Sequence, residues 1–463
     1  MTRPRLLALL WLVLWLGWQA THLDAYVFDF DEGVLLMQAR LVAEGVHPYR
    51  EMGLVFPPVW FLSAAATFAL FGPTVLAGRL LSLAYAVVGA ASAALLGRRL
   101  AGWWGGGLAL LFFTLGPELL WLSRAAMLEV PAISLGLLAL AVAAVAGQRL
   151  WAWWLAGLIM GASLMVKPLL PAEVAALLWL AWRAEGEKPA WRAVALLAGL
   201  VIPIGAVFLV YGPGDVWRYT VAFRDVLRAV YPWEPAQNAR KLLVQGVWPS
   251  LGVTLAALVG FWYTRRNPLA QALGWFWAGS LVVLFVHSPL RAQHLALISA
   301  TAAPLAAGAV RVGRSRAAGE RPQRGTVAFL LALLLVQAAG AVARSAPTYA
   351  ANYKLDNTKV RLAAFIAERV PEGEYVVVDY PIIAFRAGRS IPPILAEPSY
   401  ARIASGYLTD EIAIEATQKA QPPLIVFWSD RLERLEGYRR WVETNYTLVR
   451  LFGRRHPVYG LQP

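Results

Sequence analysis

Long, nearly uncharged apolar runs recur along most of this chain, and they limit what it can fold into. After a first run at 6–18, further runs cover roughly 57–71, 74–97, 102–122, 127–147, 150–166, 168–182, 192–211, 243–264, 268–287, 291–311 and 325–343. A helix that crosses a bilayer needs about 20 apolar residues, so several runs are full spans. Only 15% of the residues are charged, whereas soluble proteins average about 25%. The sequence therefore predicts a polytopic α-helical membrane protein.

Basic residues gather between the apolar runs, and they set the predicted topology. The clusters are Arg98–Arg99, Arg149, 183–192, Arg265–Arg266 and 311–324, the last with five arginines. Such an excess is typical of cytoplasmic loops. With the N-terminus cytoplasmic, every cluster falls on that side if 57–98 makes one net crossing, and 57–71 is then a juxtamembrane or re-entrant helix. The chain then makes about eleven crossings and ends outside the cytoplasm.

Composition also excludes some classes of function. The net charge is +14, but the basic residues form no stripe with interleaved aromatic residues, so nucleic acid is not a predicted partner. The chain has no cysteine, which excludes disulfides, thiolate metal ligands and thiol catalysis.

The last part of the chain changes character. Residues 1–344 are predicted to form the membrane module, with a long external loop at 20–56 and another at 212–242, and residues 345–463 gain charge and lose the long apolar runs. The tail has helix patterns at 356–369, 408–420 and 431–444, and strand patterns at 375–379, 424–428 and 447–452. These patterns predict a small extracytoplasmic α/β domain. It has no glycine-rich phosphate loop, so no nucleotide site is expected.

The external loop 20–56 is rich in carboxylates. Asp29, Asp31 and Glu32 lie within four residues of one another, after Asp24. Carboxylates this close repel one another and favour a cation or a proton. The alternative is a solvated loop, or a helix that Asp31 caps and that has Glu32 in its first turn.

Further charged residues fall at the predicted outer ends of separate spans. These residues are Arg124, Glu129, Lys167, His287, Arg291 and His294. Ionisable groups close to the membrane core are costly and are often functional. The alternative for Arg124 and Glu129 is an ion pair at a helix end. If these groups are instead functional, carboxylates and cations from several segments lie together on one external face.

The order of these motifs resembles the GT-C superfamily of membrane glycosyltransferases. It looks most like the branch of dolichyl-phosphate-mannose–protein mannosyltransferases and aminoarabinose transferases, including the bacterial RgtA/B/C/D-like group. The motifs are Asp31–Glu32, a Gly45 to Pro48–Tyr49 turn, Pro57–Pro58, the segment from Arg124 through Glu129 to Pro131, and Lys167–Pro168. The resemblance is clearest over 24–170, and 377–379 and 385–389 look like tails of this group.

The resemblance implies a sugar donor on a polyprenyl phosphate and transfer, with inversion, to an acceptor at the outer face. Asp31 matches the essential acidic residue of the family, which receives or orients the proton of the acceptor hydroxyl. Glu129 matches a second acidic position, and Glu32 accompanies Asp31 as a catalytic candidate. Because Phe56 stands where the aminoarabinose branch has a lysine, the donor phosphate must find its cation elsewhere.

The remaining assignments complete the expected site. The candidates for binding the donor phosphate are Lys167, Arg124, Arg291 and His294. Asp29 and Tyr49 are expected to contact the acceptor or the sugar. A divalent cation, Mg²⁺ or Mn²⁺, would suit Asp31 and Glu129, and the sequence leaves metal dependence open.

Two other classes of function compete with a glycosyltransferase. A transporter or flippase for lipid-linked sugars predicts mid-span charges and internal repeats, whereas the interiors of most spans are uncharged and the halves 1–230 and 231–463 do not resemble each other. A non-catalytic membrane scaffold would not need acidic and basic residues on one face. The sequence names neither the sugar, the acceptor (protein, lipid or glycan), the length of the lipid nor the oligomeric state.

Overall fold

The computed structural model describes residues 3–21, 23–24, 30–184, 186, 188–312, 323–352, 357–453 and 455–461. The chain forms two compact units. The helical unit comprises Met1–Leu23, Ser82–Val207 and Trp233–Ala350, and the mixed unit comprises Asp24–Leu81, Phe208–Pro232 and Ala351–Pro463. The predicted domain boundary near 345 falls close to the last change of unit, and the predicted loop 20–56 groups mostly with the tail.

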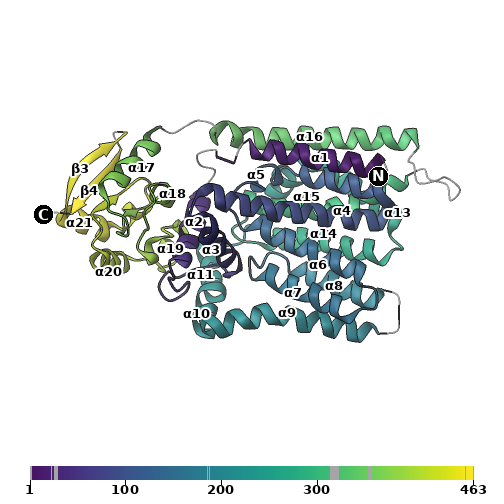
Figure 1. The fold of residues 1–463 in the computed structure, drawn as a ribbon, viewed down its shortest axis with the longest axis horizontal. Helices are drawn as coiled ribbons and strands as arrows, with labels where there is room; N and C mark the ends of the chain where they lie inside the picture. Colours follow the sequence, from purple (N-terminus) through teal and green to yellow (C-terminus); the bar gives the residue numbers. More distant parts are fainter. Residues whose placement is uncertain are drawn as a thin grey trace. The chain divides into compact units, whose positions relative to one another are not determined.

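The apolar runs of the sequence become the helices of the helical unit, many of which run side by side in Figure 1. They are α1 (Arg3–Ala20), most of α4 (Val75–Thr114), α5 (Leu119–Leu122), α6 (Glu129–Ala146), α7 (Leu150–Leu164), α8 (Pro171–Arg183), most of α9 (Pro189–Tyr211), α12 (Pro235–Arg240), the π-helix η2 (Lys241–Val247), α13 (Leu251–Thr264), α14 (Pro268–Val286), the 3₁₀ turns η3 (Ala292–Leu295) and η4 (Ala307–Arg311), α15 (Ala296–Ala306) and α16 (Arg324–Asn352). Backbone polar groups have no water partners in lipid, so helices are the form in which such runs can cross it.

By length and composition, six helical segments in the described part of the chain can cross a membrane. A seventh is added if the pair Pro235–Val247 and Leu251–Thr264, bent by 89°, counts as one span. The chain is therefore a multi-pass membrane protein, and the expected eleven crossings stay a prediction. The run 57–71 forms α3 (Val59–Phe71), which at 13 residues is shorter than these candidates.

The long helix α4 is two helices joined at a break. Ala101 (φ −143°) and Gly102 (φ +73°) leave the helical conformation there, at the gap between the predicted runs 74–97 and 102–122. A Cβ atom on Gly97 would lie 2.7 Å from the carbonyl oxygen of Gly105. The two segments therefore meet backbone to backbone next to the break, which only small residues permit.

Small residues also set the contact between α7 and α9. A Cβ atom on Gly157 would lie 1.9 Å from the carbonyl oxygen of Leu196, and one on Gly161 would lie 2.4 Å from that of Leu200. The spacing of Gly157 and Gly161 is the small-xxx-small pattern with which helices approach closely in membranes.

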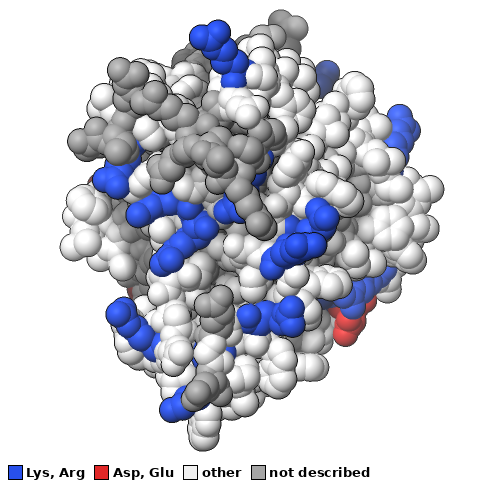
Figure 2. Space-filling model, turned by 90° about the vertical axis from the view of Figure 1, so that its right-hand side faces the viewer, with Lys and Arg blue, Asp and Glu red and all other residues white. Residues whose placement is uncertain are grey.

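One end of the helical unit carries exposed basic residues at the helix connections. They are Arg98, Arg99, Arg149, Arg183, Lys188, Arg265, Arg266, Arg311 and Arg324. Figure 2 looks onto the end at which α1 begins and shows Lys and Arg side chains spread over it, with acidic side chains sparse. Contacts tie these connections together, because the guanidinium of Arg311 donates to the carbonyl of Leu100. The predicted basic clusters thus share one end of the unit.

The mixed unit joins two inserted segments to the tail. Its helices are α2 (Phe30–Ala43), α3, α10 (Pro213–Trp217), the π-helix η1 (Arg218–Ala222), α11 (Phe223–Val230), α17 (Asn357–Arg369), α18 (Pro381–Arg386), η5 (Pro393–Leu395), α19 (Tyr400–Ala404), α20 (Asp410–Ala420), η6 (Leu432–Arg434) and α21 (Glu436–Asn445). Its strands are β1 (Val377–Val378), β2 (Leu424–Val426), β3 (Tyr446–Phe452) and β4 (His456–Leu461).

The sheet has the order β1-β2-β4-β3, with β1 parallel to β2 and the other pairs antiparallel. The predicted helices and three predicted strands of the tail correspond to α17, α20, α21, β1, β2 and β3. Strand β4 was not predicted, although it pairs with both β2 and β3. Burial raises the pKa of Asp379, which follows β1, to about 7. Its carboxylate accepts from the backbone N–H groups of Trp428 (2.7 Å) and Ser429 (2.9 Å) and so fixes the turn after β2.

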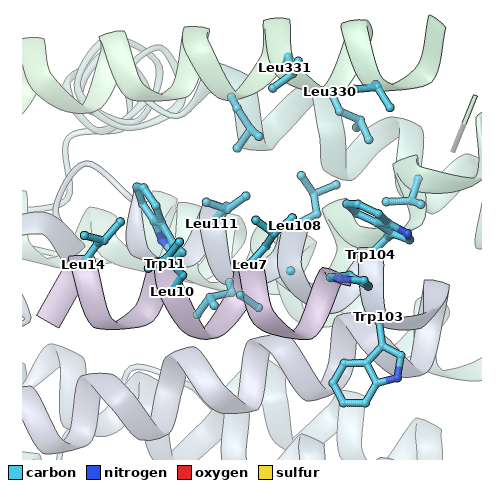
Figure 3. A pocket seen from close by; sticks show the side chains of 17 residues that line it. Leu7, Leu10, Trp11, Leu14, Trp103, Trp104, Leu108, Leu111, Leu330 and Leu331 are labelled. Atoms are coloured by element: carbon cyan, nitrogen blue, oxygen red, sulfur yellow. The ribbon is translucent and has the colours of Figure 1, made fainter. Parts of the chain in front are cut away.

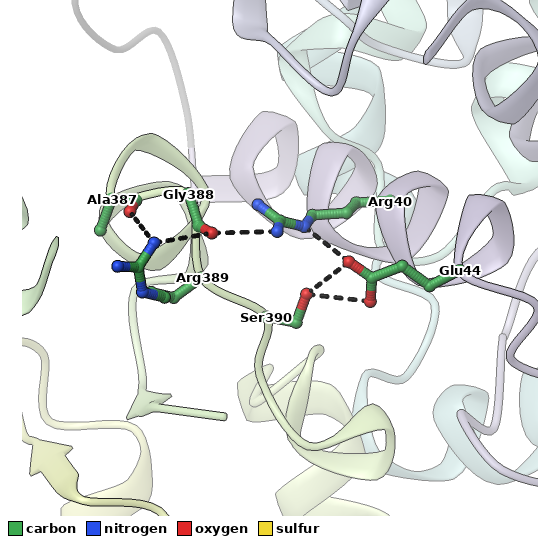
Figure 4. Close-up of polar contacts among 6 residues, drawn as sticks. All are labelled: Arg40, Glu44, Ala387, Gly388, Arg389 and Ser390. Atoms are coloured by element: carbon green, nitrogen blue, oxygen red, sulfur yellow. Dashed lines mark hydrogen bonds and ion pairs between the residues drawn. The ribbon is translucent and has the colours of Figure 1, made fainter. Parts of the chain in front are cut away.

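Helix α2 is fastened to the tail within the mixed unit (Figure 4). The guanidinium of Arg40 contacts Glu44 at 2.8 Å and donates to the carbonyl of Gly388 at 3.0 Å. The hydroxyl of Ser390 donates to both carboxylate oxygens of Glu44, at 2.8 and 2.9 Å. The tail motif at 385–389 therefore helps to hold the helix that begins with the acidic motif.

We predict that Gly157→Leu lowers the stability of the protein by about 1–3 kcal/mol, because the new side chain must force α7 away from α9. Gly205→Leu in α9 is the matched control, because a Cβ atom there meets nothing within 4 Å. Thermal unfolding of the purified protein in detergent measures both. Equal melting temperatures for the two variants would contradict the close α7–α9 contact.

Candidate functional site

The acidic motif begins helix α2. Asp31 and Glu32 occupy its first turn, where carboxylates are stabilised by the positive end of the helix dipole. The side chain of Asp31 is exposed, as a group that meets a substrate must be. Asp29, the expected acceptor contact, lies outside the described residues.

Glu32 points the other way and is fully buried. Its carboxylate forms a two-pronged ion pair with Arg79 of α4, with Arg79 Nη2 2.7 Å from Oε2 and Nε 2.8 Å from Oε1. Both side chains are 0% exposed. This geometry makes Glu32 an anchor that fixes the first turn of α2, and its expected catalytic role stays a prediction. Arg79 was not predicted, and its only signal in the sequence is a lone charge inside the run 74–97.

Aromatic rings and cations also surround the start of α2. The guanidinium carbon of Arg431 lies 3.6 Å from the ring centroid of Phe30 and 4.7 Å from that of Tyr400. The ring centroid of Tyr380 is 5.7 Å from that of Phe30. Cations over aromatic faces are favourable contacts, and here Tyr380 comes from the turn after β1, Tyr400 from the start of α19, and Arg431 from the turn after β2. The sequence did not single out these residues.

Tyr49 was expected to contact the sugar or the acceptor, and it is 0% exposed. Its hydroxyl donates to the carbonyl of Phe56 at 3.3 Å, and its ring packs edge-on against Tyr211. Burial raises the pKa of Tyr49 far above its usual value. In this conformation Tyr49 supports the loop, so its contact with a substrate stays a prediction that burial weighs against.

In the helical unit, three predicted residues from separate segments come together. The ammonium nitrogen of Lys167 lies 2.5 Å from Oε1 of Glu129 and 3.3 Å from Nε2 of His294. Nε2 of His294 is 3.8 Å from the same Glu129 oxygen. All three side chains are at least nine-tenths buried. We call these residues the Glu129 cluster.

Local chain breaks bring the Glu129 cluster together. Glu129 begins α6, Lys167 lies between α7 and α8 next to Pro168, and His294 lies in η3 between α14 and α15. Proline cannot continue a helix that precedes it, so Pro168 keeps Lys167 in the connection between α7 and α8. The ring of His287 packs edge-on against His294, with centroids 4.6 Å apart.

The other predicted cations lie differently. Arg291 is exposed, and its backbone N–H donates to Nδ1 of His294 at 3.2 Å. Arg124 is fully buried, and its guanidinium carbon lies 5.4 Å from the ring centroid of Trp18. The structure gives no ion pair between Arg124 and Glu129 among the contacts of the described residues. Glu118, which was not predicted, pairs with Arg344 at 3.2 Å.

A buried carboxylate in α8 was also missed. Glu173 is 0% exposed, and neither of its carboxylate oxygens has a hydrogen-bond partner among the described residues. Its Oε2 lies against the backbone of Gly136 in α6. Its signal in the sequence is the one acidic residue inside the run 168–182.

Asp31 belongs to the mixed unit, whereas the Glu129 cluster belongs to the helical unit. Their convergence on one substrate therefore stays a prediction. In the described part of the chain, no three His, Asp or Glu side chains gather as a metal site. A divalent cation at Asp31 and Glu129 therefore stays a prediction, and no step below uses a metal.

Comparison with known proteins identifies the fold. No family model and no curated protein matches the chain. Among solved structures, ArnT from Cupriavidus metallidurans bound to undecaprenyl phosphate matches with a TM-score of 0.66 at 15% identity, over 97% of each chain. The chain has the fold of ArnT.

ArnT is an aminoarabinose transferase of the GT-C superfamily, so the predicted GT-C-like fold is confirmed. The apo form of the same ArnT matches with a TM-score of 0.63, again at 15% identity and over 97% of each chain. The oligosaccharyltransferase of Archaeoglobus fulgidus matches with a TM-score of 0.49 at 15% identity, over 86% of this chain and 63% of its own. At these identities the likeness to ArnT shows the fold alone.

We predict that Arg79→Met lowers stability by about 3–5 kcal/mol, because it leaves the Glu32 carboxylate buried without its partner. The double variant Glu32→Leu/Arg79→Met removes both charges and should recover most of the loss. Thermal unfolding in detergent measures both variants. If the double variant is no more stable than Arg79→Met, Glu32 is not the group that Arg79 neutralises.

Proposed function

We propose that this protein is a membrane glycosyltransferase. It transfers a sugar from a polyprenyl-phosphate donor to an acceptor on the extracytoplasmic face of the cell membrane, with inversion at the anomeric carbon. The fold supports the proposal, because ArnT was crystallised with undecaprenyl phosphate bound. The acceptor is a protein, lipid or glycan whose identity the proposal leaves open.

The observation that carries the proposal is the Glu129 cluster. A carboxylate, an ammonium group and an imidazole are buried together, with Lys167 2.5 Å from Glu129. Burying charges costs free energy, and in membrane proteins such groups usually serve a substrate or ion. A lipid phosphate that leaves as an anion needs cations held ready for the developing charge.

The roles follow from the charges. Lys167 and His294, with Arg291 at the edge of the cluster and Arg124 as a further candidate, would bind the donor phosphate, since Arg and Lys suit phosphate oxygens. Glu129 would hold the Lys167 ammonium group in place. Asp31, exposed at the start of α2, would act from the mixed unit.

The reaction balances as a single displacement. The acceptor hydroxyl oxygen attacks the anomeric carbon from the face opposite the phosphate, and Asp31 takes the hydroxyl proton. The bond from the anomeric carbon to the phosphate oxygen breaks, and the polyprenyl phosphate leaves with the electron pair. Attack from the opposite face produces the inversion.

The orientation in the membrane follows from charge. The Glu129 cluster lies at the starts of α6 and η3 and at the end of α7, whereas basic residues such as Arg149 and Arg311 lie at the opposite ends of these helices. Because basic loops stay in the cytoplasm, we propose that the basic end and the N-terminus are cytoplasmic. The Glu129 cluster and the tail at 345–463 are then extracytoplasmic.

We expect Asp31→Asn to lower transfer by a factor of about 10²–10⁴, the contribution of a general base, without loss of donor binding. The polyprenyl-phosphate glycosides that copurify with the protein are identified by mass spectrometry. Their conversion to polyprenyl phosphate is then followed in native membranes, which supply the acceptor. Asp24→Asn is the matched control, since Asp24 is an exposed carboxylate of the same loop. Transfer at the normal rate by Asp31→Asn would overturn the assignment.

A double variant separates charge pairing from donor binding. We expect Glu129→Gln/Lys167→Met to fold normally, because it removes both buried charges, and to lose the copurifying donor. Lys167→Met alone should be less stable by about 3–5 kcal/mol, because Glu129 stays charged and buried. If the double variant retains the donor at the normal level, the Glu129 cluster is only a structural ion pair.

A further inference from the structure

An apolar groove opens on the helical unit, away from the Glu129 cluster. It has a volume of about 370 Å³ and lies between α1, the part of α4 after its break, and α16. Among the residues that line it are Leu7 and Leu10 of α1, Trp104 and Leu108 of α4, and Leu331 of α16 (Figure 3). The groove is continuous with the lipid-facing surface, since Leu10 is 53% and Leu331 54% exposed.

The walls of the groove are fixed to one another. Nε1 of Trp11, on α1, donates to Oγ1 of Thr114 at the end of α4 with a distance of 2.8 Å. Further along, Nε2 of Gln19 donates to the carbonyl of Leu120 at 3.2 Å. Helix α1 is thus held to this part of the unit both within the groove, at Trp11, and beyond it, at Gln19.

Two guanidinium groups lie at the basic end of the groove. The guanidinium carbons of Arg5 and Arg98 lie 4.0 and 3.8 Å from the ring centroid of Trp103, which itself lines the groove. Both arginines are exposed. Two cations that share one aromatic ring repel each other, and an anion between or beside them would offset that repulsion. The groove therefore combines an apolar slot with a positive mouth.

We propose that this groove is a binding site for an anionic phospholipid. An acyl chain lies along Leu7, Leu10 and Leu331, and the phosphate group accepts hydrogen bonds from Arg5 and Arg98. Basic groups that face the cytoplasmic leaflet attract anionic lipids, and a zwitterionic headgroup would not offset the paired charges as well. The bound lipid completes the packing of α1 and α16 against α4, so it stabilises the folded unit.

The probe is phosphatidylglycerol, with phosphatidylcholine of the same acyl chains as the neutral comparison. The full-length protein is reconstituted into nanodiscs with equal amounts of both lipids, extracted, and analysed by native mass spectrometry. We expect one retained phosphatidylglycerol at an enrichment of at least tenfold, and a melting temperature that rises with its concentration. Equal retention of the two lipids would overturn the proposal.

Two kinds of variant locate the lipid. Arg5→Gln/Arg98→Gln should abolish the enrichment, whereas Arg149→Gln/Arg183→Gln removes the same charge from exposed sites at the same end and should not. Gly107→Leu should fill the groove, because Gly107 lines it and a Cβ atom there meets nothing within 4 Å. Gly205→Leu, equally open on α9, is its control.

The outcomes divide cleanly. Loss of phosphatidylglycerol in both groove variants and not in their controls establishes the site. Enrichment that survives Gly107→Leu would place the lipid elsewhere and contradict the proposal. Added polyprenyl phosphate that displaces phosphatidylglycerol from the groove would assign it to the donor lipid instead, and would equally overturn it.

Discussion

The scarcity of water inside the membrane governs how this chain uses its charges. A buried ion costs several kcal/mol unless a partner offsets it, so each charged group in the helical unit needs a structural reason. Lys167 and Glu129 satisfy each other at 2.5 Å, and Lys167 can make that contact because it lies in the connection between α7 and α8. Pro168, next to Lys167, and Pro171, at the start of α8, keep this connection out of a continuous helix.

In the mixed unit, the cost of burying a charge also decides how two neighbouring carboxylates are used. Asp31 and Glu32 are neighbours in sequence, yet one is exposed and the other is buried on Arg79 at 2.7 Å. Because successive helix residues point about 100° apart, a single turn can present one carboxylate outwards and use the next as an anchor. Fixing Glu32 fixes the position of Asp31, and the contacts of Arg40 and Glu44 with the tail extend that anchoring.

Much of the fold could be read from the sequence, because span length and loop charge are local properties. The runs at 127–147, 150–166 and 268–287 match α6, α7 and α14 closely. The boundary between the predicted runs 74–97 and 102–122 coincides with the break in α4 at Gly102. Long-range pairings could not be read in this way. The pairings of Arg79, Arg344 and strand β4 are with partners far along the chain, and the local sequence pattern does not indicate them. The same holds for the candidate site. The predicted outer ends of spans indicated Glu129, Lys167 and His294, whereas the burial of Glu32 and Tyr49 depends on packing that the sequence does not show.

The proposed function requires Asp31 and the Glu129 cluster to act on the same donor and acceptor. Because the chain has no cysteine, it offers a direct test: the pair Asp31→Cys/Arg291→Cys, treated in native membranes with a short bismaleimide crosslinker. Asp31→Cys/Arg149→Cys is the comparison, since Arg149 lies at the basic end of the unit. We predict an efficient crosslink for the first pair and none for the second. Absence of the crosslink in the first pair, while both cysteines react with a monofunctional maleimide, would show that Asp31 and the Glu129 cluster do not converge.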